Sequence, residues 1–246
     1  MSKTAVIIPA RWASTRFPGK PLFPILGKPL LQHCWERCLK AKSVSQVIIA
    51  TDDMRIAEAA FEFGAEVAVT SPKHPSGTDR VAEVARKLTG VTNIINVQGD
   101  EPAIDPRLID KLAARLDDDR KLDMVTAAVP FADFVSAANP NNVKVVTTKD
   151  GRALYFSRSL IPFDRDQTGT AKYFWHVGIY GYRRAFLSKF VAWKPTPLEQ
   201  SEKLEQLRVL ENGASIGVII AKEHGVGVDT PEDVERAEKI LRGKKR

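Results

Sequence analysis

Three cationic side chains follow an apolar segment near the start of the chain. Arg11, Arg16 and Lys20 lie after the predicted strand Thr4–Ile8, in a loop that two prolines and a glycine constrain. Ligands of open α/β sheets bind at the carboxyl ends of the strands, so a polyanion such as a triphosphate would fit here. The loop is neither a P-loop nor a dinucleotide fingerprint, because it lacks the glycine pattern of both motifs. The competing interpretation is a solvated basic loop.

Two acidic residues far apart in the sequence are candidate ligands of a divalent metal ion. Asp100 follows the predicted buried strand Asn93–Val97, and Asp229 ends a glycine-rich turn before a predicted helix. Mg²⁺ in proteins usually takes one or two carboxylates together with substrate phosphates and water. The pair therefore suggests Mg²⁺ beside the cationic loop, although each acid alone also suits an ordinary loop or a helix cap.

A third motif, Ser76–Arg80, begins a predicted helix. Gly77 permits close approach of the backbone, and the N–H groups at a helix start can meet a base or a phosphate. Arg80, one turn into the helix, could point back to the same site. The competing interpretation is a helix cap with an exposed arginine.

The second half of the chain holds a different set of polar candidates. Arg158 and Arg165 flank the stiff apolar segment Ile161–Phe163, and two arginines held in this way suit a carboxylate on a substrate. The other candidates are His176, Tyr180, Glu205 and Gln206. Structural roles compete here too, since His176 could be a core histidine and Glu205 a solvated helix residue.

Alternating strands and helices must position the residues of the first half. The predicted strands are Thr4–Ile8, Val47–Ala50, Glu66–Val69, Asn93–Val97 and Met124–Val129, and the predicted helices are Leu31–Lys40, Met54–Phe63, Thr78–Leu88 and Pro106–Leu116. This alternation predicts a parallel sheet wound by helices on both faces.

The second half is richer in β-structure. Its predicted elements are a hairpin of Val143–Thr147 and Ala153–Phe156, strands Trp175–Tyr182 and Ser215–Ile220, and helices Arg184–Phe190 and Leu198–Leu210. A last helix is predicted to begin with Thr230 as its cap and Pro231 at its first position. We therefore expect a mixed α/β sheet with a late β-rich insertion.

Composition narrows the class of protein. The chain has 246 residues, of which 43% are hydrophobic and 27% charged, and a net charge of +7 that favours anionic ligands. We expect no nucleic-acid partner, because zinc-finger spacing and an aromatic-basic signature are missing. We also expect no membrane insertion and no signal peptide. Cys34 and Cys38, four apart on a predicted helix, read as buried free thiols, which fit a reducing cytoplasm.

A series of motifs, running nearly from end to end, resembles one family. The motifs read IPARWASTRFPGKPL from Ile8, HPSGTDR from His74, NVQGDEP from Asn96, NPNNVKVV from Asn139, ALYFSRSLIPFDRD from Ala153, HVGIYGYR from His176, LEQLRVLENG from Leu204 and GVDTPED from Gly227. In this order the chain resembles the 3-deoxy-manno-octulosonate cytidylyltransferases, also called CMP-Kdo synthetases. So many long motifs in one order make chance agreement implausible.

The resemblance implies a fold, a reaction and an assembly. The fold would be nucleotide-diphospho-sugar transferase-like, a Rossmann-like mixed sheet wound by helices with a β-rich substrate and dimerisation subdomain. Within one domain of residues 1–246, residues 1–130 would bind CTP, 131–212 would bind the sugar and dimerise, and 213–246 would supply a return strand, the metal-ligand turn and the C-terminal helix. The family transfers CMP from CTP to the anomeric hydroxyl of Kdo for lipopolysaccharide synthesis, releases pyrophosphate, depends on Mg²⁺ and forms a homodimer.

The resemblance also implies roles for individual residues. It implies a catalytic set of Lys20, Arg11, Asp100 and Asp229, of which Asp100 and Asp229 hold the metal. It implies a nucleotide site of Ala10, Arg11, Arg16, Lys20, Ser76, Gly77, Arg80, Gln98 and Asp100. It implies a site for the sugar acid of Arg158, Arg165, His176, Tyr180, Glu205 and Gln206. No convincing general base is visible.

Fine sugar specificity is the point where alternatives stay open. The segment between Asp166 and His176 is shorter than in the family, and Phe174 and Trp175 stand where the family carries a basic residue. CMP transfer to a related acid sugar, 8-amino-Kdo or sialic acid, is therefore the alternative reaction. A nucleotide-binding regulator without catalysis is a further alternative, and the presence of the catalytic set argues against it.

Overall fold

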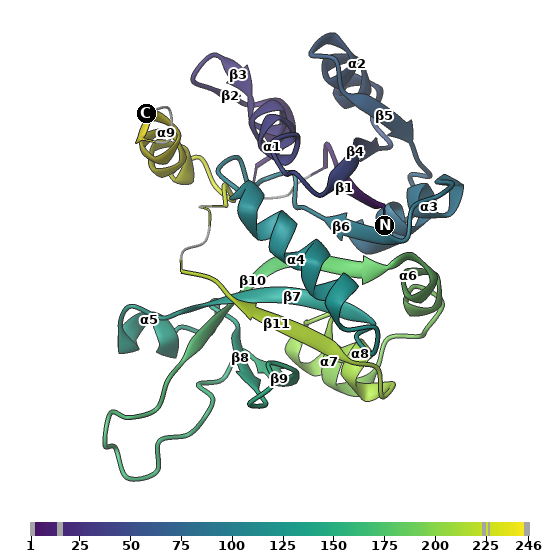
Figure 1. Ribbon diagram of the computed structural model, residues 1–246. Helices are drawn as coiled ribbons and strands as arrows, with labels where there is room; N and C mark the ends of the chain where they lie inside the picture. Colours follow the sequence, from purple (N-terminus) through teal and green to yellow (C-terminus); the bar gives the residue numbers. More distant parts are fainter. Residues whose placement is uncertain (1–2, 14–16, 223–224, 226, 244–246) are drawn as a thin grey trace. The chain divides into compact units, whose positions relative to one another are not determined.

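The computed structural model describes residues 3–13, 17–222, 225 and 227–243. It divides into two compact units (Figure 1). Unit 1 comprises Met1–Ala114 and Gly225–Arg246, and unit 2 comprises Arg115–His224. Each unit is described by itself.

Unit 1 is built on a parallel sheet with β1 (Thr4–Ala10) inside it. β1 pairs in parallel with β4 (Val44–Thr51) on one side and with β6 (Asn93–Asn96) on the other, and β4 pairs in parallel with β5 (Glu66–Val69). Residues Ala5–Ile8 of β1 and Ile94 and Ile95 of β6 are fully buried, as expected for parallel strands that helices cover on both faces.

Helices connect the strands of unit 1 and begin where the sequence supplies caps. α1 (Leu30–Cys38), α2 (Met54–Glu62) and α3 (Gly77–Lys87) follow β3 (Lys28–Pro29), β4 and β5 in turn. The side chains of Asp53 and Ser76 accept backbone N–H groups at the starts of α2 and α3. α4 (Pro106–Asp118) begins in unit 1, and Cys34 and Cys38 are buried free thiols, as predicted.

An apolar cluster ties the first loop of unit 1 to the end of the chain. The buried members of this loop–terminus cluster are Phe17, Ile25, Leu30, Ala103, Val228, Ala237 and Leu241. They come from the loop after β1, the short hairpin of β2 (Pro24–Ile25) and β3, the loop after β6, and the C-terminal helix α9 (Asp233–Gly243). Burial of these side chains therefore brings together segments that are far apart in the sequence.

Unit 2 contains a mixed sheet. β7 (Met124–Pro130) pairs in parallel with β11 (Ile216–Ile220) and antiparallel with β10 (Phe174–Arg183), and β8 (Lys144–Thr147) pairs with β10 and with β9 (Ala153–Ser157). Its helices are α5 (Phe134–Ala138), α6 (Arg184–Phe190), α7 (Pro197–Glu202) and α8 (Leu207–Glu211).

Most predicted elements are confirmed, and two are wrong in detail. The single helix predicted over Leu198–Leu210 is two helices, because Lys203 takes a left-handed conformation (φ 54°) that ends α7. The last helix begins at Asp233 rather than after Thr230. The Asp233 carboxylate accepts the N–H of Thr230. Residues 230–232 therefore form a turn that precedes the helix, and α9 begins at Asp233. In the described part of the chain, no helix is both long and apolar enough to span a bilayer.

Candidate active site

The ammonium group of Lys20 lies between two carboxylates from distant parts of unit 1. Its Nζ atom donates to Asp100 Oδ2 at 2.7 Å and to Asp229 Oδ1 at 3.4 Å. The Lys20 side chain is 13% exposed, whereas Asp100 and Asp229 are 30% and 52% exposed. The structure therefore brings together the two acids that the sequence singled out as metal ligands.

Lys20 is held by a tightly packed turn. Gly19 has φ 72°, which favours glycine, and its N–H donates to the Trp12 carbonyl at 3.2 Å. A Cβ atom on Gly19 would lie 3.2 Å from the Trp12 ring, and the Arg55 guanidinium lies 3.5 Å from the centroid of that ring. The contacts of Trp12 with Gly19 and Arg55 thus hold the turn that carries Lys20 in place.

The end of β6 and the turn at Val228 position Asp100. A Cβ atom on Gly99 would lie 3.1 Å from the Pro9 carbonyl oxygen, so a larger residue would crowd the backbone of β1. The N–H of Val228 donates to the Asp100 carbonyl at 2.9 Å. This backbone contact joins the two acidic turns directly.

Asp233 positions the turn of Asp229. Its carboxylate accepts the N–H groups of Asp229 at 2.9 Å and of Thr230 at 3.0 Å, and it pairs with Arg236. Burial tends to raise the pKa of Asp233, but the Asp229 N–H, the Arg236 guanidinium and the Thr230 N–H together lower it. Asp233 therefore stays ionised, and its charge keeps the turn closed.

Arg11 presents an unsatisfied hydrogen-bond donor. Among the described residues, its buried Nη2 atom has no hydrogen-bond partner. Burial lowers the pKa of Arg11, as does the nearby Arg80 charge, and Asp52 and Asp79 partly offset this. A buried, unpaired guanidinium N–H is costly unless a ligand satisfies it, so this geometry suits an anion. Ala10 ends β1 just before it, and Arg16 lies outside the described residues.

The start of α3 combines a cap with a buried arginine. The Ser76 hydroxyl caps the helix by accepting the Asp79 N–H at 3.2 Å. Arg80 is 1% exposed, pairs with Asp52 at 2.9 Å and donates to the Thr70 hydroxyl at 2.5 Å. The interpretation of Arg80 as an exposed helix residue is therefore wrong.

In unit 2, two predicted residues of β10 meet a third, Gln206, at the start of α8. The rings of His176 and Tyr180 lie 5.5 Å apart, and the Tyr180 hydroxyl lies 3.4 Å from Gln206 Oε1. Among the described residues, the buried Gln206 Nε2 has no hydrogen-bond partner. Burial lowers the pKa of His176 to about 3 and raises that of Tyr180, so both side chains are neutral at physiological pH.

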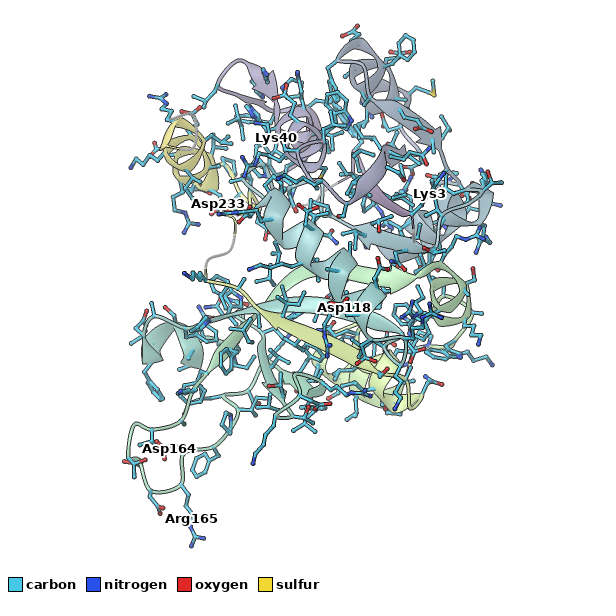
Figure 2. The ribbon with its side chains drawn as sticks, in the orientation of Figure 1. Lys3, Lys40, Asp118, Asp164, Arg165 and Asp233 are labelled. Carbon is cyan, nitrogen blue, oxygen red and sulfur yellow. The ribbon has the colours of Figure 1, made fainter. Side chains whose placement is uncertain are left out.

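The other three predicted residues of unit 2 are dispersed. Arg158 donates through Nε to the Glu202 carbonyl at 2.8 Å and through Nη1 to the Pro140 carbonyl at 3.2 Å. Glu205 lies 3.8 Å from an Arg208 nitrogen. Figure 2 shows exposed Arg165 at the far end of the loop after β9. This chain alone therefore does not bring Arg165 and Arg158 onto one carboxylate, because the loop carries Arg165 outward.

The donor set of unit 1 suits a hard divalent cation. Asp100 and Asp229 supply carboxylate oxygens, which Mg²⁺ prefers, and their side chains are partly exposed, which leaves room for water and phosphate ligands. The described residues contain no cluster of three or more His, Cys, Asp or Glu side chains able to hold a metal. The chemistry thus fits a metal that shares its coordination sphere with a substrate.

Comparison with known proteins decides the family. A cytidylyltransferase family model matches residues 5–216. The 3-deoxy-manno-octulosonate cytidylyltransferase of Geobacter metallireducens is 50% identical, over 98% of this chain and 98% of its own. The Haemophilus influenzae enzyme of the same name is 51% identical, over 96% of this chain and 97% of its own. This chain belongs to the 3-deoxy-manno-octulosonate cytidylyltransferase family.

A solved structure agrees with this family. CMP:2-keto-3-deoxy-manno-octonic acid synthetase complexed with CTP superposes with a TM-score of 0.95 at 42% identity, covering 99% of this chain and 100% of its own. The predicted fold class, a mixed α/β sheet wound by helices as in nucleotidyltransferases, is thereby confirmed.

In this member of the cytidylyltransferase family, several residues of the site carry no clear signal of their own in the sequence. These residues are Asp233, Asp52, Trp12 and Arg55. Asp52 directly follows β4, and Arg55 lies in the first turn of α2. The position of Asp52 after a buried strand, at the same sheet edge as the cationic loop, is the sequence signal that points to it.

Proposed function

We propose that this chain transfers CMP from CTP to the anomeric hydroxyl of Kdo and releases pyrophosphate. The observation that carries the proposal is the contact of Lys20 with both Asp100 and Asp229 in unit 1. In the same unit, the buried Nη2 atom of Arg11 has no partner within the described part of the chain. Membership of the cytidylyltransferase family supports the same reaction.

The proposed chemistry relies on charge neutralisation and positioning. Nucleotidyl transfer moves negative charge onto the leaving pyrophosphate, and fixed cations beside that charge lower the barrier. Lys20 and Arg11 would bind the triphosphate oxygens, with Arg16, Ala10, Ser76, Gly77, Arg80 and Gln98 completing the nucleotide site. Lys20 would be the residue that most stabilises the transition state, because its turn is rigid.

Asp100 and Asp229 would hold Mg²⁺ in this proposal. When bound, the ion neutralises phosphate charge and lowers the pKa of a coordinated hydroxyl group. Lys20 now occupies the position between the two acids, so it would move its contact from carboxylate to phosphate as substrate and metal bind.

The sugar acid would be bound by residues of unit 2, namely Arg158, Arg165, His176, Tyr180, Glu205 and Gln206. Gln206 Nε2 has no partner among the residues that the structure describes, and this supports the role, because a buried amide donor needs an acceptor such as a sugar oxygen or carboxylate. His176 is neutral, so it would contribute hydrogen bonding rather than charge.

A homodimer is part of the proposal, and an apolar groove in unit 2 supports it. The groove has a volume of about 1110 Å³ and is lined by residues that include Phe131, Phe134, Phe163, Tyr173 and Phe174. Phe134 and Phe163 are 62% and 81% exposed. Exposed aromatic groups around one groove indicate an interface, and we assign it to a second copy of this chain.

Pyrophosphate release tests the proposed reaction. The purified chain is incubated with CTP, Mg²⁺ and one of Kdo, 8-amino-Kdo or sialic acid. We expect release with Kdo and formation of CMP-Kdo. Release only with another sugar acid would overturn the substrate, and CTP binding without release would identify a regulator instead.

A further inference from the structure

A buried hydroxyl group contacts His176 from the neighbouring strand. Thr126, on β7, is fully buried, and its Oγ1 atom lies 3.0 Å from His176 Nε2. The same oxygen lies 2.8 Å from the Ile179 carbonyl oxygen and 3.2 Å from the Val177 carbonyl oxygen. Three polar groups therefore converge on one hydroxyl that has a single proton to give.

An irregularity in strand pairing explains this convergence. Val177 pairs with Ala127 and Tyr180 with Thr126, so Gly178 and Ile179 have no partner in the β7 register. Such a bulge removes carbonyl groups from the regular ladder and re-aims nearby side chains. Thr126 supplies a hydrogen bond within the bulge.

The distribution of protons follows from these contacts. Carbonyl oxygens can only accept, so the Thr126 hydroxyl must donate to Ile179 or Val177. If the Thr126 hydroxyl donated its proton to His176 instead, neither carbonyl oxygen would receive a hydrogen bond from it. Both carbonyl oxygens would then face the lone pairs of the hydroxyl oxygen in a buried site, which is unfavourable. His176 must therefore donate from Nε2–H to Thr126, and its Nδ1 atom carries the lone pair.

The surroundings keep the ring neutral and fixed. The Phe156 ring meets His176 edge-on with centroids 4.9 Å apart, and Tyr180 lies on another side at 5.5 Å. Burial lowers the pKa of His176 to about 3. Among the described residues, none is hydrogen-bonded to Nδ1, so this acceptor is available to a ligand.

We propose that Thr126 is a positioning residue of the sugar site: it fixes His176 as the Nε2–H tautomer and thereby makes Nδ1 the acceptor for a hydroxyl group of the substrate. This proposal rests on the proposed function. It assigns His176 to a hydroxyl of the sugar rather than to its carboxylate, because a neutral acceptor does not attract an anion.

The tautomer can be measured without any activity. Long-range ¹H–¹⁵N correlation spectra of the full chain labelled with ¹⁵N-histidine distinguish Nε2–H from Nδ1–H, and His176→Gln assigns the signal. We expect Nε2–H in the native protein and in Thr126→Ser, and a mixture or the Nδ1–H form in Thr126→Val. Nδ1–H in the native protein, or an unchanged pattern in Thr126→Val, would overturn the proposal. If Thr126→Val does not fold, the spectrum of the native protein still tests the proposal, because Nδ1–H in that spectrum would overturn it.

Kinetics test the acceptor role. His176→Gln keeps a donor near the Nε2 position and removes the Nδ1 acceptor. We expect about a tenfold loss of kcat/KM for Kdo with an unchanged KM for CTP, as for one lost hydrogen bond. The second test uses a set of Kdo analogues that each lack one hydroxyl. The native enzyme should turn over one of these analogues more slowly than Kdo, whereas His176→Gln should turn over that analogue and Kdo at similar rates. Equal discrimination by both enzymes against every analogue contradicts the proposal. If the native enzyme makes no CMP-Kdo at all, the proposed function fails while the tautomer result still stands.

Discussion

Lys20 Nζ lies 2.7 Å from the carboxylate of Asp100, although 80 residues separate the two in sequence. The contact exists because the loop–terminus cluster and the close approach at Gly99 bring the first loop and the loop after β6 together. The same ammonium group reaches Asp229 at 3.4 Å. A cation and two acids thus form one partly exposed group in unit 1.

Removing the Lys20 ammonium group should affect turnover more than sugar binding. For Lys20→Ala we expect kcat to fall by a factor of about 10²–10³, the range for loss of a preorganised group that stabilises transition-state charge. The KM for Kdo should change little. Steady-state kinetics measure both constants. Lys28→Ala is the matched control, because Lys28 pairs with Glu36 on an exposed surface. A change confined to the KM for Kdo would show that Lys20 serves the sugar instead.

Gly19 should be required for its contact with Trp12 as well as for its backbone conformation. Gly19→Ala and Gly27→Ala both place a side chain at positive φ (72° and 79°), which costs about 1–2 kcal/mol in each case. Only Gly19→Ala also presses on the Trp12 ring at 3.2 Å. Chemical denaturation should therefore show a loss of stability in both variants, the larger one in Gly19→Ala, whereas kcat/KM for CTP should fall only in Gly19→Ala. Equal losses of kcat/KM for CTP in the two variants would show that the contact with Trp12 does not contribute to the use of CTP.

Glu83 should make stability depend on acid pH. The Ser71 N–H, His74 and Lys87 lower the pKa of Glu83 to about 2, below its ordinary value of about 4.3. A lowered carboxyl pKa stabilises the fold above pH ~4.3, and this stabilisation is lost as the pH falls through about 2. Glu83→Gln should thus lower the free energy of unfolding at pH 7 by about 1–2 kcal/mol, with the difference shrinking below pH ~4.3.

The measurement for Glu83 is urea denaturation at a series of pH values. Glu58→Gln, on the exposed surface of α2, is the control and should change the free energy of unfolding little at any pH. A difference between the native protein and Glu83→Gln that stays constant from pH 7 to pH 3 would mean that the Glu83 charge does not stabilise the loop before α3.

The apolar groove of unit 2 should hold the proposed dimer together. Phe163→Ser removes an aromatic side chain that is 81% exposed, and we expect a lower apparent mass in light scattering at micromolar protein. Phe61→Ser removes one that is 78% exposed on α2 and should leave the mass unchanged. A monomeric native protein, or a Phe163→Ser variant that keeps the full mass, contradicts this assignment.

The sequence alone predicts an element correctly where its local pattern agrees with the burial of its side chains in the fold. The apolar run of β1 and the hairpin around Gly151 each carry their own pattern, and each forms as predicted. The cap at Ser76, which competed with a ligand-binding role in the sequence, is also present. The convergence of Asp100 and Asp229 was also predicted, because both follow turns at strand ends and match motifs of one family.

Other features depend on tertiary contacts that no local pattern carries. Lys203 breaks the predicted helix because the Thr196–Glu199 capping box and the Arg208–Glu199 pair fold α7 back onto α8. The burial of Arg80 depends on Asp52, which arrives from another loop. The bulge at Gly178 and Ile179 is invisible in an alternating strand pattern, so the role of Thr126 could not be anticipated.

Divalent-metal binding by the two acids tests the central claim most directly. Mn²⁺ binding to the CTP complex, followed by electron paramagnetic resonance, is compared for the native chain, Asp100→Asn, Asp229→Asn and the exposed control Asp150→Asn. We predict that Asp100→Asn and Asp229→Asn each weaken Mn²⁺ at least about tenfold, the effect of losing one charged ligand, and that Asp100→Asn abolishes turnover at ordinary Mg²⁺ levels. Native Mn²⁺ affinity and turnover in either variant would contradict a shared metal site at Lys20.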